Sequence, residues 1–464
     1  MEDFLRHLGR HSYDLSPLDI IPNHLYLTNV FFFENTRSEN EQFIPEKTLK
    51  MSFYDALKSF PILVGHLKPN GLNNMHIVVD PDHVVLPTWE SSNSHIDFHD
   101  VKKHGFHRDY WPDGLDISDP LLRYEGGNPP KLVRVRVCRF ANDSGLALVV
   151  RLSHSVFDAK GCTFFINHWA TCYSRRLKPK LAYSPVQAPI INRAVMYQHL
   201  SPRVQPTPLS WFLWPISFII VNIFMLVEIF GGKQTTAGTS QSHLFCLPRD
   251  TLDRLREDKQ ADRRLSDNDI VTALFTMAYA QLLQAKQKAG TRRGKLPKEI
   301  TAIVPCDFRH RLGVPENYTG SCAIGLYVTC PFSLLVQPIS SSALSKAAGI
   351  SRLTIDGVDA QVIEGFTKRA MMAVKMMGDK VRILYSLMVA QAFSNQSRLP
   401  FYEADFGCGK PQFVAPMAYS KSLAVIVPSP PTSQDVYVFL TLEVEDMEIV
   451  MGNKDFRKVV EIIY

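Results

Sequence analysis

The chain has 464 residues, of which 45% are hydrophobic and 21% charged, the composition of an ordinary globular protein with an ample core. This length predicts two domains or one large two-lobed unit. The net charge of +6 is spread along the chain without a dense basic stripe, which argues against a nucleic-acid-binding protein and suits an enzyme that handles an anionic ligand.

Eight cysteines are scattered along the chain without a CxxC pair or a Cys/His ligand spacing. Their distribution argues against a disulfide framework, predicts no metal site and suits a reducing compartment. Residues 1–10, MEDFLRHLGR, are charged and lack an apolar core, so we expect no signal peptide. Together these features predict a cytoplasmic protein.

The first part of the chain alternates between predicted strands and helices. Residues 25–33, LYLTNVFFF, are rich in β-branched and aromatic side chains, which predicts a buried strand. Residues 45–61 predict a helix because apolar side chains recur there every three or four positions. Further strands are expected at 76–80, 83–87, 131–140 and 146–153, and a further helix at 162–176.

Between residues 179 and 239 the composition shifts to Pro, Gln, Thr and Ser around one apolar stretch, which predicts a linker. The pattern then restarts. Strands are expected at 242–248, 300–308, 321–330, 424–429 and 435–444, and helices at 251–258, 266–286 and within 341–392. We therefore divide the chain into an N-terminal lobe (1–185), a crossover linker (186–240) and a C-terminal lobe (241–464).

A histidine and an aspartate lie close together where the predicted strand 146–153 ends. The segment RLSHSVFDAKG, residues 151–161, carries them as His154 and Asp158. The histidine is either a base at the floor of a pocket or a core histidine with an acid nearby, and the spacing alone leaves both interpretations open.

A second segment, LPFYEADFGCGKP at residues 399–411, brings Asp405, Gly407 and Gly409 into a tight run where the backbone must turn sharply. By itself it indicates a loop between a helix and a strand.

Together these two segments resemble the BAHD acyltransferases of plants and fungi, which carry an HxxxDG motif in mid-chain and a DFGWG motif near the C-terminus. The resemblance extends to LSPLD and LKMSFYDALKSFPILVGHL near the start, and to RLSDNDIVTAL and DFRHRLGVPENYTGS in the second half. It covers nearly the whole chain except the linker. It implies an α/β, chloramphenicol-acetyltransferase-like fold of two lobes, each a mixed sheet with flanking helices.

The resemblance also implies an enzyme that transfers an acyl group from acyl-CoA to a hydroxyl or amine of a small-molecule acceptor. His154 would be the general base, because imidazole titrates near neutrality, and the reaction would pass through a ternary complex without an acyl-enzyme. Acyl-CoA would be a co-substrate, and no cofactor would be bound permanently. The sequence contains no G-x-S-x-G segment that would suggest a serine nucleophile.

The other motif residues are expected to support the site rather than to react. By resemblance, Asp158 points away from the channel and pairs with Arg309 of DFRHR, since a buried carboxylate needs such a partner. Asp405 would place Gly407 and Gly409 so that the backbone can approach the cofactor.

The chain departs from the family's motifs at three positions. The glycine after the motif aspartate is Ala159, with Gly161 two residues further on. The tryptophan of DFGWG is Cys408, and the asparagine of the family's YFGN segment is Ser321. A thiol in place of an indole opens space where the motif meets the substrate channel, so the family's acceptor preferences do not carry over.

The segment RRLSDND places Arg263, Arg264 and Ser266 directly before a predicted helix, where backbone N–H groups and the helix dipole favour anions. We expect the CoA phosphates here, because the family also binds CoA near this helix. A second basic run at 286–298 competes with it, although a solvated loop is the simpler interpretation of that run.

Residues 211–230, WFLWPISFIIVNIFMLVEIF, form an apolar segment that the family does not predict. The segment is long enough to span a bilayer, but a single span would separate the two halves that build the channel. Three alternatives stay open: a dip into a membrane surface, a helix or lid over the channel, and a true span. Contact with a membrane would make the protein peripheral on an intracellular membrane.

Two other functions are compatible with the same fold. One is a carrier-protein-dependent condensation enzyme, which usually carries a doubled histidine, whereas Ser153 precedes His154 here. The other is a catalytically silent, membrane-associated binder of a lipid or metabolite. The favoured prediction is a monomer that binds acyl-CoA and a small acceptor and does not bind nucleic acid.

Overall fold

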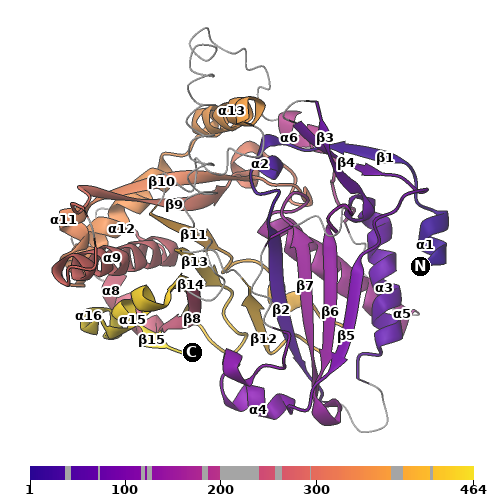
Figure 1. Ribbon diagram of the computed structural model, residues 1–464, viewed down its shortest axis with the longest axis horizontal. Coiled ribbons are helices and arrows are strands. Elements are labelled where there is room, and N and C mark those ends of the chain that lie inside the picture. Colours follow the sequence, from indigo (N-terminus) through magenta and orange to yellow (C-terminus); the bar gives the residue numbers. More distant parts are fainter. Residues whose placement is uncertain are drawn as a thin grey trace.

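The computed structural model describes residues 1–36, 43–71, 74–115, 121–122, 128–179, 187–198, 240–256, 264–292, 294–377, 390–417 and 422–464. These residues form two lobes that lie side by side, each built on one large sheet with helices packed against it (Figure 1). The predicted two-lobed α/β class is confirmed.

The sheet of the first lobe has the strand order β12-β2-β7-β6-β5. Its strands are β2 (Tyr26–Glu34), β5 (Thr88–Asn93), β6 (Val133–Arg139), β7 (Gly145–Ser153) and β12 (Phe413–Pro416). Neighbouring strands are antiparallel except β5 and β6. β12 comes from the C-terminal half of the chain, so the second half of the sequence completes the sheet of the first lobe.

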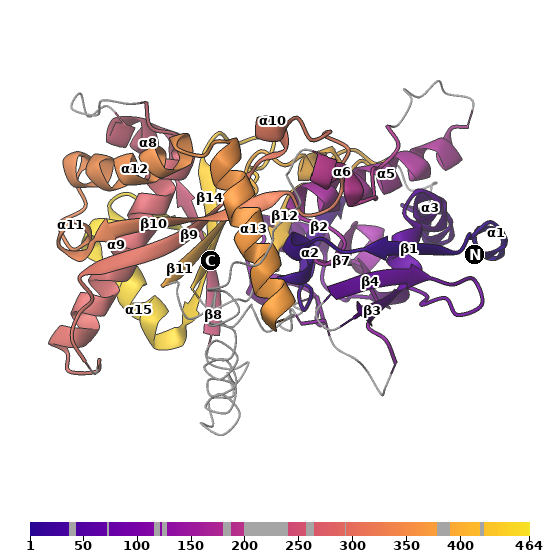
Figure 2. The same ribbon diagram turned by 90° about the horizontal axis from the view of Figure 1, so that it is seen from above.

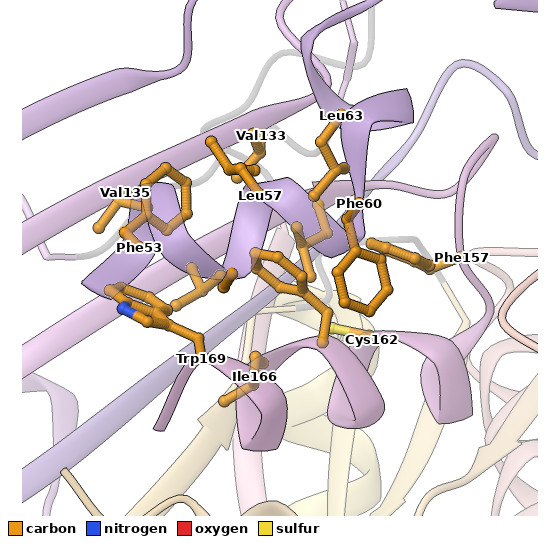
Figure 3. Close-up of a cluster of buried hydrophobic side chains, with 14 of the residues drawn as sticks. Phe53, Leu57, Phe60, Leu63, Val133, Val135, Phe157, Cys162, Ile166 and Trp169 are labelled. Carbon is orange, nitrogen blue, oxygen red and sulfur yellow. The ribbon is translucent and has the colours of Figure 1, made fainter. Parts of the chain in front are cut away.

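Two helices, α3 (Glu46–Ser59) and α5 (Ala159–Leu177), pack together over this sheet. Aromatic side chains fill the space between them (Figure 3). The ring of Phe53 lies 5.0 Å from that of Trp169, and the ring of Phe60 lies 5.8 Å from that of Phe157. The Trp169 indole N–H donates to the Ser52 hydroxyl at 3.0 Å, so its one polar atom is satisfied.

The sheet of the second lobe has the order β10-β9-β11-β13-β14-β8-β15. Its strands are β8 (Ser240–Leu247), β9 (Glu299–Asp307), β10 (Ala323–Pro331), β11 (Gln391–Asn395), β13 (Leu423–Val427), β14 (Val436–Glu443) and β15 (Glu461–Ile462). The helices of this lobe are α8 (Arg249–Arg256), α9 (Asp267–Lys288), α11 (Phe332–Leu335), α12 (Ser341–Asp356), α15 (Val444–Gly452) and α16 (Lys454–Arg457). The strands and helices predicted on this side of the linker correspond to these elements.

Smaller elements complete the two lobes. A three-stranded sheet joins β1 (His11–Asp14), β4 (Asn74–Val79) and β3 (His66–Asn70). The short helices are α1 (Glu2–Arg6), α2 (Pro17–Ile20), α4 (Phe98–Lys103), α6 (Ala194–Gln198) and α10 (Arg309–Leu312), with 3-10 turns η1 (Pro61–Val64), η2 (Arg108–Tyr110), η3 (Ala141–Asp143) and η5 (Phe401–Glu403). Helix α13 (Ala360–Met377) packs against both α2 and β10 and so bridges the lobes (Figure 2).

One predicted strand is wrong. Residues 83–87 form no strand, because the backbone N–H of Val85 donates to the carbonyl of Val64 at 3.0 Å instead of joining a ladder. Pro87, which has no N–H to donate, then precedes β5. The helices expected within 341–392 are α12 and α13 as far as Met377, and residues 378–389 lie outside the described part of the chain. The expectation is wrong at its end, because Gln391–Asn395 form strand β11, which the sequence analysis did not predict.

An apolar cluster joins the two lobes. It contains Phe32 and Phe106 of the first lobe together with Val425 and Phe439 of the second. The guanidinium of Arg108 lies 4.5 Å from the centre of the Phe439 ring, a cation–π contact across the same boundary. The two lobes therefore share a buried apolar core and are held together by packing as well as by the chain that connects them.

The apolar segment 211–230 lies outside the described residues, so the three alternatives for it remain predictions. Among the helices that the structure does describe, none combines the length and the hydropathy needed to cross a bilayer.

Thr319, in the second half of the chain, lies close to Gly161 of α5. A Cβ atom added to it would lie 2.2 Å from the carbonyl oxygen of Thr319. We expect Gly161→Ala to lower the free energy of unfolding by ~1–3 kcal/mol through this overlap, measured by urea denaturation. The control is Gly349→Ala in α12, where an added Cβ meets nothing within 4 Å and should raise stability. Equal changes in the free energy of unfolding for the two variants would contradict the close packing of Gly161 against Thr319.

Candidate active site

His154 follows directly after β7, in a backbone position that is fixed by strand pairing. Ser153 pairs with Tyr26 at the end of the β2–β7 ladder, and the backbone N–H of His154 donates to the carbonyl of Leu25 at 2.9 Å. Because β7 is also paired with β6 on its other side, the strand that carries the histidine is held from both edges.

The ring of His154 is among the side chains that line a pocket of about 350 Å³. The first lobe contributes residues 25–29 of β2 and the turn before it, together with Ala159 and Cys162 of α5. The C-terminal half contributes mainly apolar side chains, namely Pro305, Phe393, Phe401, Pro416, Met417, Leu423 and Val425, with Ser394 and Gln396. The pocket is therefore bounded by both halves of the chain, and most of its wall is apolar.

Burial lowers the pKa of His154 below the ordinary histidine value. The backbone of His154 and Phe157 and the negative charges of Asp158 and Asp19 oppose this shift without cancelling it. Among the described residues, no group makes a hydrogen bond of ordinary geometry to Nδ1. The lowered pKa favours the neutral form of the ring, which is the form that accepts a proton.

Asp158 is turned away from the pocket. Its Oδ1 accepts the backbone N–H of Gly161 at 2.9 Å and caps the first turn of α5. Its Oδ2 lies 2.7 Å from Nη2 of Arg309 and accepts the backbone N–H of Cys322 at 3.1 Å. The carboxylate therefore connects the loop after β7 to the chain before β10, and its bonds leave it no part in a triad with His154.

Arg309 is only 1% exposed and is bonded on every side. Its Nη2 also donates to the carbonyl of Gly320 at 2.8 Å, Nε donates to the carbonyl of Tyr318 at 3.3 Å, and Nη1 lies 2.9 Å from Asp307. Burial disfavours the charged guanidinium, but the charges of Asp158 and Asp307 outweigh it, and the pKa of Arg309 is raised.

The loop that carries Asp405 packs against the far part of α5. Oδ1 of Asp405 accepts the N–H of Gly409 at 2.9 Å, and both Gly407 and Gly409 have positive φ, which closes the turn. Phe406 is buried against Trp169 and Tyr173, which lie about 15–21 Å along α5 from its first residue at the 1.5 Å rise of an α-helix. The structure thus places this loop toward the opposite end of α5 from His154.

The predicted CoA-phosphate residues are only partly described. Arg263 lies outside the described residues, and Arg264 is exposed. Ser266 is the N-cap residue of α9. Its hydroxyl donates a hydrogen bond to Asp269 at 2.7 Å and accepts one from Arg352 at 2.9 Å. The start of α9 nevertheless adjoins the pocket wall, because the side chain of Asn395, next to the pocket residues Ser394 and Gln396, donates to Asn268 at 2.8 Å.

A family model described as the transferase family matches residues 6–456, nearly the whole chain. The chain belongs to this family, the BAHD acyltransferases. It is an acyltransferase by that membership.

Curated and solved members of the BAHD family cover this chain almost end to end. The shikimate O-hydroxycinnamoyltransferase of Nicotiana tabacum is 22% identical, over 94% of this chain and 93% of the relative. A malonyl-CoA:anthocyanidin 5-O-glucoside-6''-O-malonyltransferase of Arabidopsis thaliana is 24% identical, over 86% and 84%. The structure of TRI101 from F. graminearum complexed with ethyl coenzyme A has a TM-score of 0.73 at 14% identity and covers 98% of this chain and 100% of its own. The chloramphenicol-acetyltransferase-like fold is confirmed by these likenesses.

The departures from the BAHD motifs fall at distinct structural positions. Ala159 is the first residue of α5 and lines the pocket, while Gly161 supplies the N–H that Asp158 caps. Cys408 is half-buried and packs on the core beneath α5. Ser321 is buried, and its backbone N–H donates to Asp19 at 2.9 Å. Of these residues, Ala159 lines the pocket, whereas Cys408 and Ser321 are not among the described lining residues. The space that we expected the Cys408 thiol to open is therefore not seen at this pocket.

Two buried charged residues near the site did not emerge from the sequence. Asp19 and Arg193 are 0% and 2% exposed, and Nε of Arg193 lies 3.2 Å from Oδ2 of Asp19. Asp19 stands in LSPLD, a segment used above only for the family resemblance, where its spacing from Ser16 also fits a capping box. Arg193 lies in the crossover region and carries no motif that could have identified it.

Removing Arg309 tests the buried pair. We expect Arg309→Met to lower the free energy of unfolding by about 3–5 kcal/mol, because it leaves Asp158 buried without its cation. The matched control is Lys458→Met, since Lys458 and Asp455 form an exposed pair that should contribute less than about 1 kcal/mol. Urea denaturation of both variants gives the comparison, and an Arg309→Met loss no larger than that of the control would refute the architectural role.

Proposed function

We propose that this BAHD-family protein transfers an acyl group from acyl-CoA to a hydroxyl or amine of a small-molecule acceptor, with His154 as the general base. The observation that carries the proposal is the position of His154 in the wall of a pocket formed by both halves of the chain. Its lowered pKa favours the base form. The relatives support the reaction class, because they are named as hydroxycinnamoyl and malonyl transferases.

The proposed step needs only one base and a thioester. His154 takes the proton of the acceptor O–H or N–H as that atom attacks the thioester carbonyl carbon. The tetrahedral intermediate collapses with cleavage of the C–S bond, and the protonated imidazole returns its proton to the departing CoA thiolate. Both substrates are bound at once, so no acyl group is carried by the enzyme.

The pocket wall supports a largely apolar acyl or acceptor group beside His154. Phe393, Leu423 and Val425 present carbon, whereas Asn29 and Gln396 are polar side chains that can orient a ligand by hydrogen bonds. For the CoA phosphates we keep the start of α9 as the proposed site. There Arg264 and the undescribed Arg263 would supply charge, and the Ser266 hydroxyl is already used as a cap.

Replacing the base is the direct test. We expect His154→Ala to reduce acceptor-dependent thiol release from acyl-CoA by about 10²–10⁴-fold, because a neutral alcohol or amine loses its proton acceptor. The assay incubates a panel of acyl-CoAs with cell extract as the source of acceptors, and mass spectrometry identifies the product. His83→Ala, a change at an exposed histidine, should leave the rate unchanged.

The same assay separates the alternatives. A carrier-dependent condensation enzyme would be inactive with free acyl-CoA and active with acyl groups tethered to a carrier protein. A silent binder would show no turnover in the wild type that His154→Ala could remove. Wild-type turnover that persists in His154→Ala would refute the general-base role.

The pH profile gives an independent prediction. The pKa of His154 is lowered, so the ring should lose its base form at a lower pH than an ordinary histidine does. We expect kcat/KM to be constant through neutrality and to decline on an acid limb whose midpoint lies below the ordinary histidine value of about 6.5. Steady-state rates across this range give the measurement, and a midpoint at or above that value would contradict the buried, neutral ring.

A further inference from the structure

The loop from His154 to Asp158 is bonded to the rest of the protein at two points, the Asp158 carboxylate and the Val156 carbonyl. Asp158 is bonded to Arg309, as described above. The carbonyl of Val156, two residues after the histidine, accepts a hydrogen bond from Nη2 of Arg193 at 2.6 Å. Arg193 is 2% exposed and comes from the segment between the lobes.

Arg193 is itself fixed by two further bonds. Its Nη1 donates to the carbonyl of Ile191 at 2.6 Å, and its Nε donates to Asp19 at 3.2 Å. All three guanidinium nitrogens of Arg193 thus donate hydrogen bonds at the same time, and together these bonds fix the orientation of the side chain. A lysine at this position has a single ammonium and lacks the planar fork that makes all three bonds together.

Asp19 is equally well bonded. Its Oδ2 accepts the backbone N–H of Ser16 at 3.0 Å and the hydroxyl of Ser16 at 2.6 Å. Its Oδ1 accepts the backbone N–H of Ser321 at 2.9 Å. The carboxylate therefore connects the start of α2, the chain before β10 and Arg193, and Arg193 connects all of them to the catalytic loop.

A buried ion pair of this kind contributes little net stability, because the cost of desolvating two charges offsets their attraction. What the pair supplies instead is geometry. Val156 and Phe157 both donate their N–H groups to the carbonyl of Ser153, which closes the turn, and the Val156 carbonyl is the acceptor that Arg193 holds. The turn after His154 is thereby bonded at the Val156 carbonyl as well as at Asp158.

We propose that Arg193 and Asp19 are a positioning pair for His154, acting through the Val156 carbonyl and making the segment between the lobes part of the active site's support. The consequence for turnover rests on the proposed function of His154. The coupling of the pair to His154 does not rest on the proposed function, because the titration of the ring can be measured without turnover.

Charged and titratable groups reach His154 from several elements. Asp158 lies on its own loop, Asp19 on α2, and Arg193 in the segment between the lobes. Arg309 and Asp307 lie behind Asp158, and the Cys162 thiol of α5 is neutral because burial raises its pKa. The charge of Asp19 favours the protonated ring. We expect the positive charge of Arg193, which pairs with Asp19, to oppose it. The two halves of the pair should therefore shift the titration of His154 in opposite directions.

The test is the titration of His154 by NMR in full-length protein labelled with ¹³C-histidine, with the resonance assigned by its absence in His154→Gln. Asp19→Asn removes a charge that favours the protonated ring, so the midpoint should move to lower pH. Arg193→Met leaves Asp19 without its cation, so the midpoint should move to higher pH. Arg193→Lys keeps the charge and should leave the midpoint near that of the wild type.

Kinetics then separate geometry from charge. Arg193→Lys cannot make all three bonds, so we expect kcat to fall by about 10–100-fold while KM changes little, since a base displaced by a fraction of an ångström works poorly. Arg139→Met is the matched structural control. Arg139 also bonds two backbone carbonyls and an aspartate, Asp143, but it lies at the opposite end of the β6–β7 ladder. This control should lose stability without moving the titration midpoint or kcat.

Opposite shifts in Asp19→Asn and Arg193→Met, with a low kcat in Arg193→Lys, support the proposal. Shifts of the same sign, or changes no larger than those in Arg139→Met, overturn it. If the wild type shows no acyl transfer, the proposed function fails. Opposite shifts would then show that the pair is coupled electrostatically to His154, and shifts of the same sign would overturn that coupling as well. Wild-type kcat in Arg193→Lys would show that the pair is structural only.

Discussion

The ion pair between Asp158 and Arg309 is the interaction on which the rest of the site depends. It ties the loop after β7 of the first lobe to the chain that leads into β10 of the second, with 2.7 Å between Oδ2 and Nη2. Both partners are buried and fully bonded, so neither can move without exposing an uncompensated charge to a low-dielectric interior. Because this ion pair fixes the loop that follows His154, it also restrains the position of His154, together with the strand pairing at the end of β7.

The pocket exists because the two halves of the chain are interleaved. β12 crosses back to pair with β2, and this brings Pro416 and Met417 into the wall of the pocket. The shared apolar cluster packs the two lobes against each other, and α13 contacts both of them. A cavity between two separately folded domains would open and close, whereas here its walls are also the walls of a common core.

Local sequence patterns predicted most of the elements, since apolar periodicity and turn residues act over a few positions. The repeat of Leu49, Phe53 and Leu57 marks the face of α3 that packs on α5. The prediction failed at 83–87, where Val85 bonds to Val64, a partner in a different element. Arg193 was missed for a similar reason, because its partner Asp19 lies 174 positions away and the spacing between them carries no periodic signal.

The sequence by itself determined most of the alternation of strands and helices and the family, and it led us to propose His154 as the base, because these depend on residue types in local order. Only the tertiary structure decided that the ring of His154 lines a pocket, that Asp158 faces Arg309, and that Asp19 and Arg193 hold the same loop. Burial and partner choice depend on which distant segments meet. A buried charge reveals its partner only once the chain is folded around it.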